Sequence, residues 1–206
     1  MDELQNQFEL IADGLAEKGY GIAENFLTKD EVAAIRGLKV MHANIETLQK
    51  AGIGKENRQI NESVRGDHIE WIDAATAPFE LKVALERIEA LRNYLNRSLF
   101  LGLKDFEVHI ARYPAGAGYK KHLDQFRKDD HRKISVVCYL NENWQIEDGG
   151  QLKMYFPDNN LEILPEGGKL ICFRSDLIEH EVLPAGRERA SLTGWMLDQF
   201  SDLRHL

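Results

Sequence analysis

The chain is poor in cysteine and has no long apolar run, and each shortage narrows the class of protein. Only two cysteines occur in 206 residues, Cys138 and Cys172. Both lie in apolar stretches, so we interpret them as small buried hydrophobic residues and not as a disulfide or a metal-binding pair. No apolar run approaches the roughly 20 residues that span a bilayer, and the acidic, amphipathic N-terminus lacks the pattern of a secretory signal. We therefore expect a cytoplasmic protein with no membrane partner.

An excess of basic residues is also missing. The formal net charge is -8, with 26 Lys and Arg scattered among 34 Asp and Glu. Binding to a phosphate backbone depends on clustered positive charge, so the sequence argues against a nucleic-acid partner. An apolar content of 43% is typical of a globular chain. With no internal repeat, residues 1–206 are expected to form a single domain.

Helical spacing of apolar residues dominates residues 1–100. It predicts helices over residues 2–18, from Thr28 to about Ala51, and from Pro78 onward. Thr28 followed by Glu31 is a capping-box pattern. A polar segment, residues 52–63, leads into an extended piece at residues 69–73. We interpret this part as mainly helical support for a sheet, together with a substrate loop.

Beyond Phe106 the apolar period changes to two, which is typical of strands. Eight short runs are separated by Gly, Pro and Asp turn signals. The expected strands are 108–113, 120–124, 133–141, 149–156, 161–165, 167–175, 180–185 and 190–198. Strands that follow helices predict an α+β chain in which residues 101–200 form a double-stranded β-helix, or jelly roll.

His122, Asp124 and His180 are the candidate metal ligands. Residues two apart on a strand project to the same face, so His122 and Asp124 are expected side by side, with Leu123 turned away into packing. A jelly roll can return the distant His180 to the same place. Two imidazoles and one carboxylate are the ligand set of non-haem Fe(II) oxygenases. A His-x-Asp triplet alone also arises by chance, so the identification needs further support.

Arg189 is a candidate for binding an acidic cosubstrate. Arg189, Ser191, Thr193 and Trp195 share one strand face by the period of two. A guanidinium can bind a carboxylate through two hydrogen bonds, so an inward-facing Arg189 suits an acidic cosubstrate. Taken alone, this arginine would more often be an exposed surface charge.

Five stretches resemble one known family in the same order. They are VRGDHIEWID, ARYPAGAGYKKHLD, CYLNENW, EDGGQLKMYFP and HEVLPAGRERASLTGWMLD, within residues 64–198. The chain is similar in them to the Fe(II)- and 2-oxoglutarate-dependent prolyl 4-hydroxylases, the group that contains the enzymes acting on hypoxia-inducible factor and their bacterial relatives.

This resemblance implies a role for each matching residue. His122, Asp124 and His180 would hold Fe(II), and Arg189 would bind the distal carboxylate of 2-oxoglutarate, so these four would be catalytic. The residues that would line the cosubstrate site are Tyr113, Tyr139, Leu152, Val182 and Thr193. The residues that would contact the substrate are Arg65, Asp67, Trp71 and Trp195, with Arg65 and Asp67 paired in a segment that closes over a peptide. Without the resemblance, each tyrosine and Trp195 would be ordinary core residues.

The implied reaction is hydroxylation of a prolyl residue at C4 in a protein substrate. O2 and 2-oxoglutarate would be consumed and succinate and CO2 formed, with ascorbate as a supporting reductant. Bacterial members of the group act on elongation factor Tu, which is therefore the first candidate partner. Two other interpretations stay open: an oxygenase of the same chemistry acting on a small molecule or free amino acid, and a non-enzymatic module that binds iron or 2-oxoglutarate.

Overall fold

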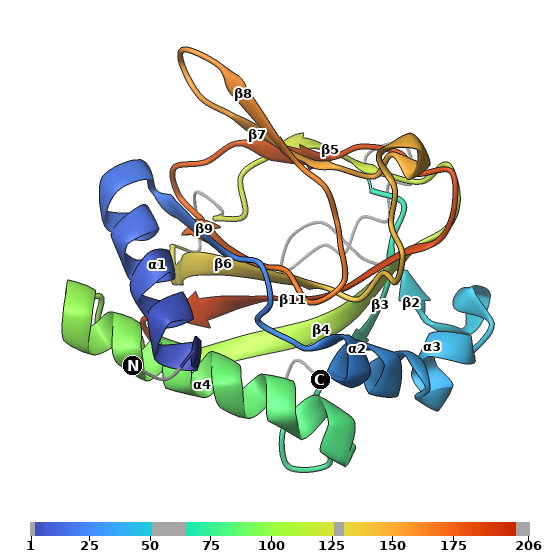
Figure 1. Ribbon diagram of the computed structural model, residues 1–206, viewed down its shortest axis with the longest axis horizontal. Coiled ribbons are helices and arrows are strands. Elements are labelled where there is room, and N and C mark those ends of the chain that lie inside the picture. Colours follow the sequence, from blue (N-terminus) through green and yellow to red (C-terminus); the bar gives the residue numbers. More distant parts are fainter. Residues whose placement is uncertain (1–2, 51–64, 126–129, 201–206) are drawn as a thin grey trace.

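The computed structural model describes residues 3–50, 65–125 and 130–200, which form two antiparallel sheets with helices on one side (Figure 1). The larger sheet has the order β1-β9-β6-β11-β4-β3-β2 and the smaller one the order β5-β10-β7-β8. The strands of the larger sheet are β1 (Tyr20–Ala23), β9 (Leu170–Arg174), β6 (Arg132–Tyr139), β11 (Arg189–Leu197), β4 (Asp105–Tyr113), β3 (His68–Trp71) and β2 (Gln49–Lys50). Those of the smaller sheet are β5 (Tyr119–His122), β10 (His180–Val182), β7 (Leu152–Tyr155) and β8 (Asn160–Ile163). Each of the eight expected strand runs overlaps one of these strands, and the jelly-roll prediction is confirmed.

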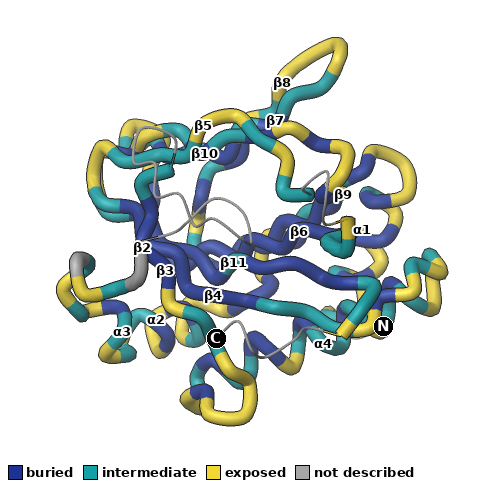
Figure 2. The backbone as a smooth tube through the Cα atoms, turned by 180° about the vertical axis from the view of Figure 1, so that it is seen from behind, coloured by how far each residue is buried: buried dark blue, intermediate teal, exposed yellow. Residues whose placement is uncertain are grey.

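The helices cover the face of the larger sheet that points away from the smaller one (Figure 1). They are α1 (Glu3–Lys18), α2 (Lys29–Arg36), α3 (Lys39–His42) and α4 (Phe79–Leu99). The middle strands of the larger sheet are buried along most of their length, and exposed residues lie on the outer sides of the helices (Figure 2). Of these helices, none is both long and apolar enough to cross a membrane within the residues described.

Alternate residues of the central strands serve two different cores. In β6, Ile134, Val136 and Cys138 pack against the helices. Their neighbours Val137 and Tyr139 belong to the second core, between the two sheets. This alternation follows from the period of two in a strand. It leaves one face of the larger sheet free to build a site between the sheets.

The expected single helix from Thr28 to about Ala51 is wrong. The capping box at its start is present, since the Glu31 amide donates to Thr28 Oγ1 at 3.2 Å and the Glu31 carboxylate accepts from the Thr28 amide at 2.8 Å. The helix ends at Arg36, with Gly37 as its C-cap, and the chain continues through α3 and a short 3-10 helix. Glycine is a poor residue for a helix interior. The other two helices match the expectation closely, and the polar segment 52–63 lies outside the described residues.

Candidate active site

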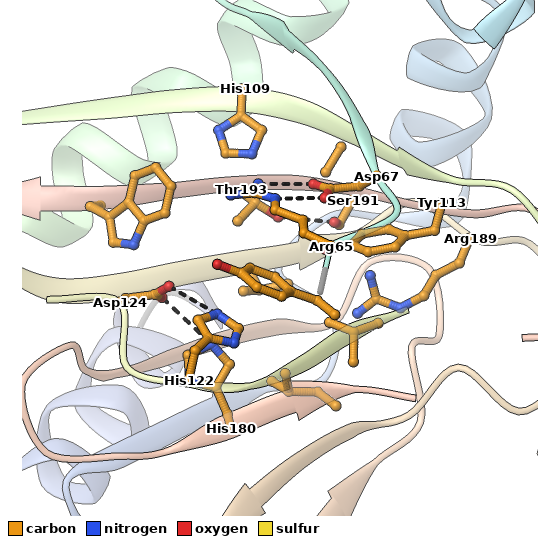
Figure 3. A pocket seen from close by; sticks show the side chains of 16 residues that line it. Arg65, Asp67, His109, Tyr113, His122, Asp124, His180, Arg189, Ser191 and Thr193 are labelled. Atoms are coloured by element: carbon orange, nitrogen blue, oxygen red, sulfur yellow. Dashed lines mark hydrogen bonds and ion pairs between the residues drawn. The ribbon is translucent and has the colours of Figure 1, made fainter. Parts of the chain in front are cut away.

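The three candidate metal ligands meet between the two sheets. His122 ends β5 and His180 begins β10, and the two residues are direct cross-strand partners. An Asp124 carboxylate oxygen lies 3.5 Å from His122 Nε2, and the other lies 3.7 Å from His180 Nε2. Each residue offers one ligand atom, and these atoms all lie within 4.8 Å of one another. One cation could therefore contact all three side chains (Figure 3).

Asp124 reaches this cluster in a different way from the one expected. Strand β5 stops at His122, so Asp124 does not share a strand face with it but lies in a bend beyond the strand end. Leu123 is 38% exposed and does not turn into packing. Two hydrogen bonds hold the bend instead: Ser135 Oγ donates to Asp124 Oδ2 at 2.6 Å, and the Gln125 amide donates to the Ser175 carbonyl at 3.1 Å. The carboxylate is thus placed by neighbours from the larger sheet.

Both imidazoles present Nε2 to the centre of the cluster. Nδ1 of His122 lies 2.7 Å from the Lys120 carbonyl, and Nδ1 of His180 lies 3.0 Å from the Ile178 carbonyl. A carbonyl only accepts, so each Nδ1 carries the proton and each Nε2 keeps its lone pair. Burial lowers the pKa of His180, which favours its neutral form. Burial opposes ionisation of Asp124, but the hydrogen bond from Ser135 Oγ favours the carboxylate and lowers its pKa. Two neutral nitrogens and one carboxylate fit Fe(II).

A buried arginine lies at another part of the same pocket. Arg189 is 2% exposed, and its Nε donates to the Gly150 carbonyl at 2.9 Å. No carboxylate pairs with it among the residues described. Its Cζ lies 5.2 Å from the ring centre of Tyr113 and 5.0 Å from that of Tyr139. Burial of an arginine without a carboxylate is costly, so this end of the pocket suits an acidic ligand.

The hydroxyl of Tyr139 supports the same conclusion. It is buried and has no hydrogen-bond partner in the described part of the chain. Burial raises the pKa of Tyr139 to about 12, so the phenol stays neutral and can donate. A ligand carboxylate that accepts from this hydroxyl and from Arg189 would satisfy both groups. The residues present therefore fit the distal end of 2-oxoglutarate.

Most of the expected site residues line this single pocket. From the smaller sheet and its bend come His122, Asp124, Leu152, His180 and Val182, and from the larger sheet and the segment before β3 come Arg65, Asp67, Tyr113, Arg189, Thr193 and Trp195. Tyr139 contacts Arg189 from outside this lining, and Trp71 packs against Trp195 with ring centres 6.4 Å apart.

Arg65 and Asp67 form a bidentate ion pair at the pocket wall. The two bonds measure 2.6 and 2.9 Å, and the Asp67 side chain is fully buried. The Arg65 guanidinium lies 4.8 Å from the ring centre of Tyr119, and the Gly66 amide donates to the Gly118 carbonyl at 3.0 Å. These contacts join the segment before β3 to the strand that carries His122.

Tyr119 and His109 also line the pocket, and neither was expected from the sequence. Tyr119 stacks on His122 with ring centres 3.5 Å apart, and the His109 ring packs against both Trp71 and Trp195. His109 has the same strand parity as Tyr113 on β4, so the period of two could have indicated its inward direction. Tyr119 sits in a strand too short for such a pattern to be read.

Comparison with known proteins agrees with this geometry. Residues 108–197 match the family model of the 2OG-Fe(II) oxygenase superfamily. A crystal structure of a prolyl-4-hydroxylase from Pseudomonas putida is 42% identical, with 94% of this chain and 100% of that chain covered and a TM-score of 0.83. The prolyl hydroxylase of Trichoplax adhaerens, solved with a hypoxia inducible factor peptide fragment, is 26% identical, with 95% and 91% covered and a TM-score of 0.85. The chain therefore belongs to the 2OG-Fe(II) oxygenase superfamily.

Within that class, the chain belongs to the prolyl hydroxylase family. The hypoxia-inducible factor prolyl hydroxylase of Caenorhabditis elegans is 28% identical over 93% of this chain, which spans 28% of that protein. Human Egl nine homolog 1 is 26% identical over 95% of this chain, which spans 47% of that protein. The chain thus spans less than half the length of these two relatives. Fe(II), 2-oxoglutarate and O2 are the cofactor and cosubstrates of the family.

Proposed function

We propose that this chain is a dioxygenase that hydroxylates C4 of a prolyl residue in a protein substrate, with succinate and CO2 as coproducts. One observation carries the proposal: a single pocket holds a two-histidine, one-carboxylate cluster and a buried Arg189 without a carboxylate partner among the described residues. The first suits the metal and the second suits the cosubstrate. Other uses of a buried metal cluster do not require the arginine.

In this proposal, each group has a defined task. His122, Asp124 and His180 hold Fe(II), which supplies the oxidising chemistry when 2-oxoglutarate and O2 are bound. Arg189 and Tyr139 bind the distal carboxylate, and so fix the orientation of the cosubstrate. Tyr113 and Thr193 line the same space, and the apolar side chains of Leu152 and Val182 exclude water from it.

The substrate side of the pocket is aromatic. Trp195 is 5% exposed, and the Arg132 guanidinium lies 3.4 Å from its ring centre. A flat aromatic wall suits a pyrrolidine ring, which has little hydrogen-bonding capacity. The relative from Trichoplax adhaerens was solved with a peptide fragment, which supports a protein substrate here. Arg65, Asp67 and Trp71 would contact the chain on either side of the proline.

Elongation factor Tu is the candidate substrate, and mass spectrometry tests it directly. The iron-loaded protein is incubated with elongation factor Tu from the same organism, 2-oxoglutarate, ascorbate and air, and the peptides are then mapped. We expect a gain of one oxygen, about 16 Da, on a single proline, as oxygen transfer requires. An Asp124→Ala variant and an incubation without 2-oxoglutarate are the controls.

The other outcomes separate the competing functions. If 2-oxoglutarate is consumed but elongation factor Tu gains no oxygen, the oxygenase stands and this substrate is wrong. Succinate release stimulated by a free amino acid or other small molecule, and not by a proline peptide, would replace the protein substrate. If 2-oxoglutarate binds but is not consumed under air, the chain is a binding module.

A further inference from the structure

The imidazole of His109 is completely buried, and its hydrogen-bonding atoms are unmatched. The residue is 0% exposed and lines the pocket. Neither Nδ1 nor Nε2 has a hydrogen-bond partner among the residues that the structure describes. A buried polar atom without a partner costs about 1–3 kcal/mol, and most such atoms in proteins are satisfied by a neighbour, a water or a ligand. A ligand that reaches this wall of the pocket would satisfy His109 by hydrogen bonding to its ring nitrogens.

Its surroundings belong to the substrate side of the pocket. The ring centre of His109 lies 4.9 Å from that of Trp71 and 5.5 Å from that of Trp195. Figure 3 shows it on the wall opposite His122 and His180. The indole nitrogen of Trp195 is also buried and without a partner in the described chain. Two neighbouring rings thus present unmatched polar atoms on one wall.

The kind of group that would match them follows from their chemistry. Burial, together with the nearby Arg65 guanidinium, lowers the pKa of His109 to about 3. The imidazole is therefore neutral and offers one donor and one acceptor, whereas the Trp195 indole only donates. A prolyl nitrogen carries no hydrogen. The main-chain groups beside a proline ring that can bind these donors are carbonyl oxygens.

We propose that His109 donates a hydrogen bond to a main-chain carbonyl oxygen of the substrate beside the target proline, and so contributes to substrate specificity. This inference rests on the proposed function, because it needs a prolyl substrate in the pocket. It assigns His109 to substrate binding and leaves the metal and 2-oxoglutarate to other residues. The Trp195 indole suits the same kind of acceptor.

A second buried histidine provides a matched control. His68 on β3 is 9% exposed, and both of its ring nitrogens also lack a partner among the described residues. It does not line the pocket. His68→Phe and His109→Phe therefore remove the same kind of group from two buried positions. Only the second removes it from the substrate side.

The experiment measures steady-state hydroxylation of the peptide that the wild-type protein modifies. For His109→Phe we expect the KM for the peptide to rise about tenfold, the effect of one lost hydrogen bond. The KM for 2-oxoglutarate should stay unchanged. His68→Phe should behave as wild type in both. His109→Gln, which keeps a donor and an acceptor, should recover part of the peptide affinity.

Each alternative result has a distinct meaning. An unchanged peptide KM in His109→Phe would overturn the proposal, as would an equal rise in both phenylalanine variants, which would indicate a general packing effect. If a variant loses activity, the comparison is repeated without turnover. Calorimetry then measures the Kd of the peptide for the zinc-loaded protein in the presence of 2-oxoglutarate. Wild-type protein that hydroxylates no peptide would instead refute the proposed function.

Discussion

Replacing Tyr139 by phenylalanine should make the free protein more stable and its binding of 2-oxoglutarate weaker. The hydroxyl is buried and has no hydrogen-bond partner among the described residues, and such an atom costs about 1–3 kcal/mol. Removing it leaves only a small void, so we expect a net gain of about 1 kcal/mol. For a chain of this length, that gain raises the Tm by about 2–4 °C.

The effect on cosubstrate binding should have the opposite sign. A hydrogen bond from a phenol to a carboxylate is worth about 1.5–3 kcal/mol, and 1.4 kcal/mol corresponds to a factor of ten. The Kd for 2-oxoglutarate should therefore rise by about 10- to 100-fold in Tyr139→Phe. Calorimetry on the zinc-loaded protein measures this Kd, and thermal unfolding of the metal-free protein measures the stability.

Tyr94→Phe is the control, because Tyr94 packs against the helix-side core and not against the pocket. It should leave the affinity for 2-oxoglutarate unchanged. A Tyr139→Phe variant that unfolds at a lower temperature and binds 2-oxoglutarate as tightly as wild type would refute the reasoning. That result would mean that the hydroxyl stabilises the protein itself and does not bind the cosubstrate.

Three other perturbations test the site and the fold. Asp124→Ala should abolish succinate formation. Loss of a group that only orients a metal ligand already lowers metal affinity by about 10- to 100-fold, and loss of the anionic ligand itself should lower it more. Retained turnover would show that Asp124 is not a metal ligand. Zn(II) binds N/O sites more tightly than Fe(II), so added zinc should inhibit the iron-loaded protein, and turnover indifferent to zinc would contradict the assigned ligands. Burial opposes ionisation of Glu31, but hydrogen bonds from the Thr28 amide and Arg87 lower its pKa. The Glu31 carboxylate therefore stabilises the folded protein above its unfolded-state pKa, and this stabilisation is lost as the pH falls. Glu31→Gln should therefore lower the free energy of unfolding by about 1 kcal/mol at neutral pH, and denaturant unfolding should show this gap closing at acidic pH; a gap that persists in acid would contradict the assignment.

The strands were predictable because both of their faces are buried in a regular way. Runs such as residues 133–141 carry apolar side chains toward two cores, which gives a strong signal in the sequence. The path from Thr28 to Ala51 was not predictable to the same degree. Its helical spacing continues past Gly37, but the chain there forms short elements whose positions depend on tertiary contacts. For example, Arg112 donates to the Val40 and Ala43 carbonyls at 3.1 and 2.8 Å.

The meeting of His122, Asp124 and His180 could be expected from the motif and the jelly roll, but the bend that positions Asp124 could not. The place of Asp124 in that bend depends on Ser135, a hydrogen-bond partner from another sheet. His109 was missed for a related reason. A histidine on a buried strand is usually a satisfied core residue, and only the structure shows that its nitrogens lack partners among the described residues.

The number of residues in strand β11 determines which of its side chains face the pocket. Arg189, Ser191, Thr193 and Trp195 line the pocket, while Ala190, Leu192 and Met196 pack against the helices. A shift of one residue would exchange the two faces, so an insertion or deletion within this strand would put leucine in the pocket and a guanidinium in the core. Substitutions on the pocket face avoid that penalty. Point mutations on this face of β11 can therefore change the lining of the pocket. The number of residues in the strand cannot change.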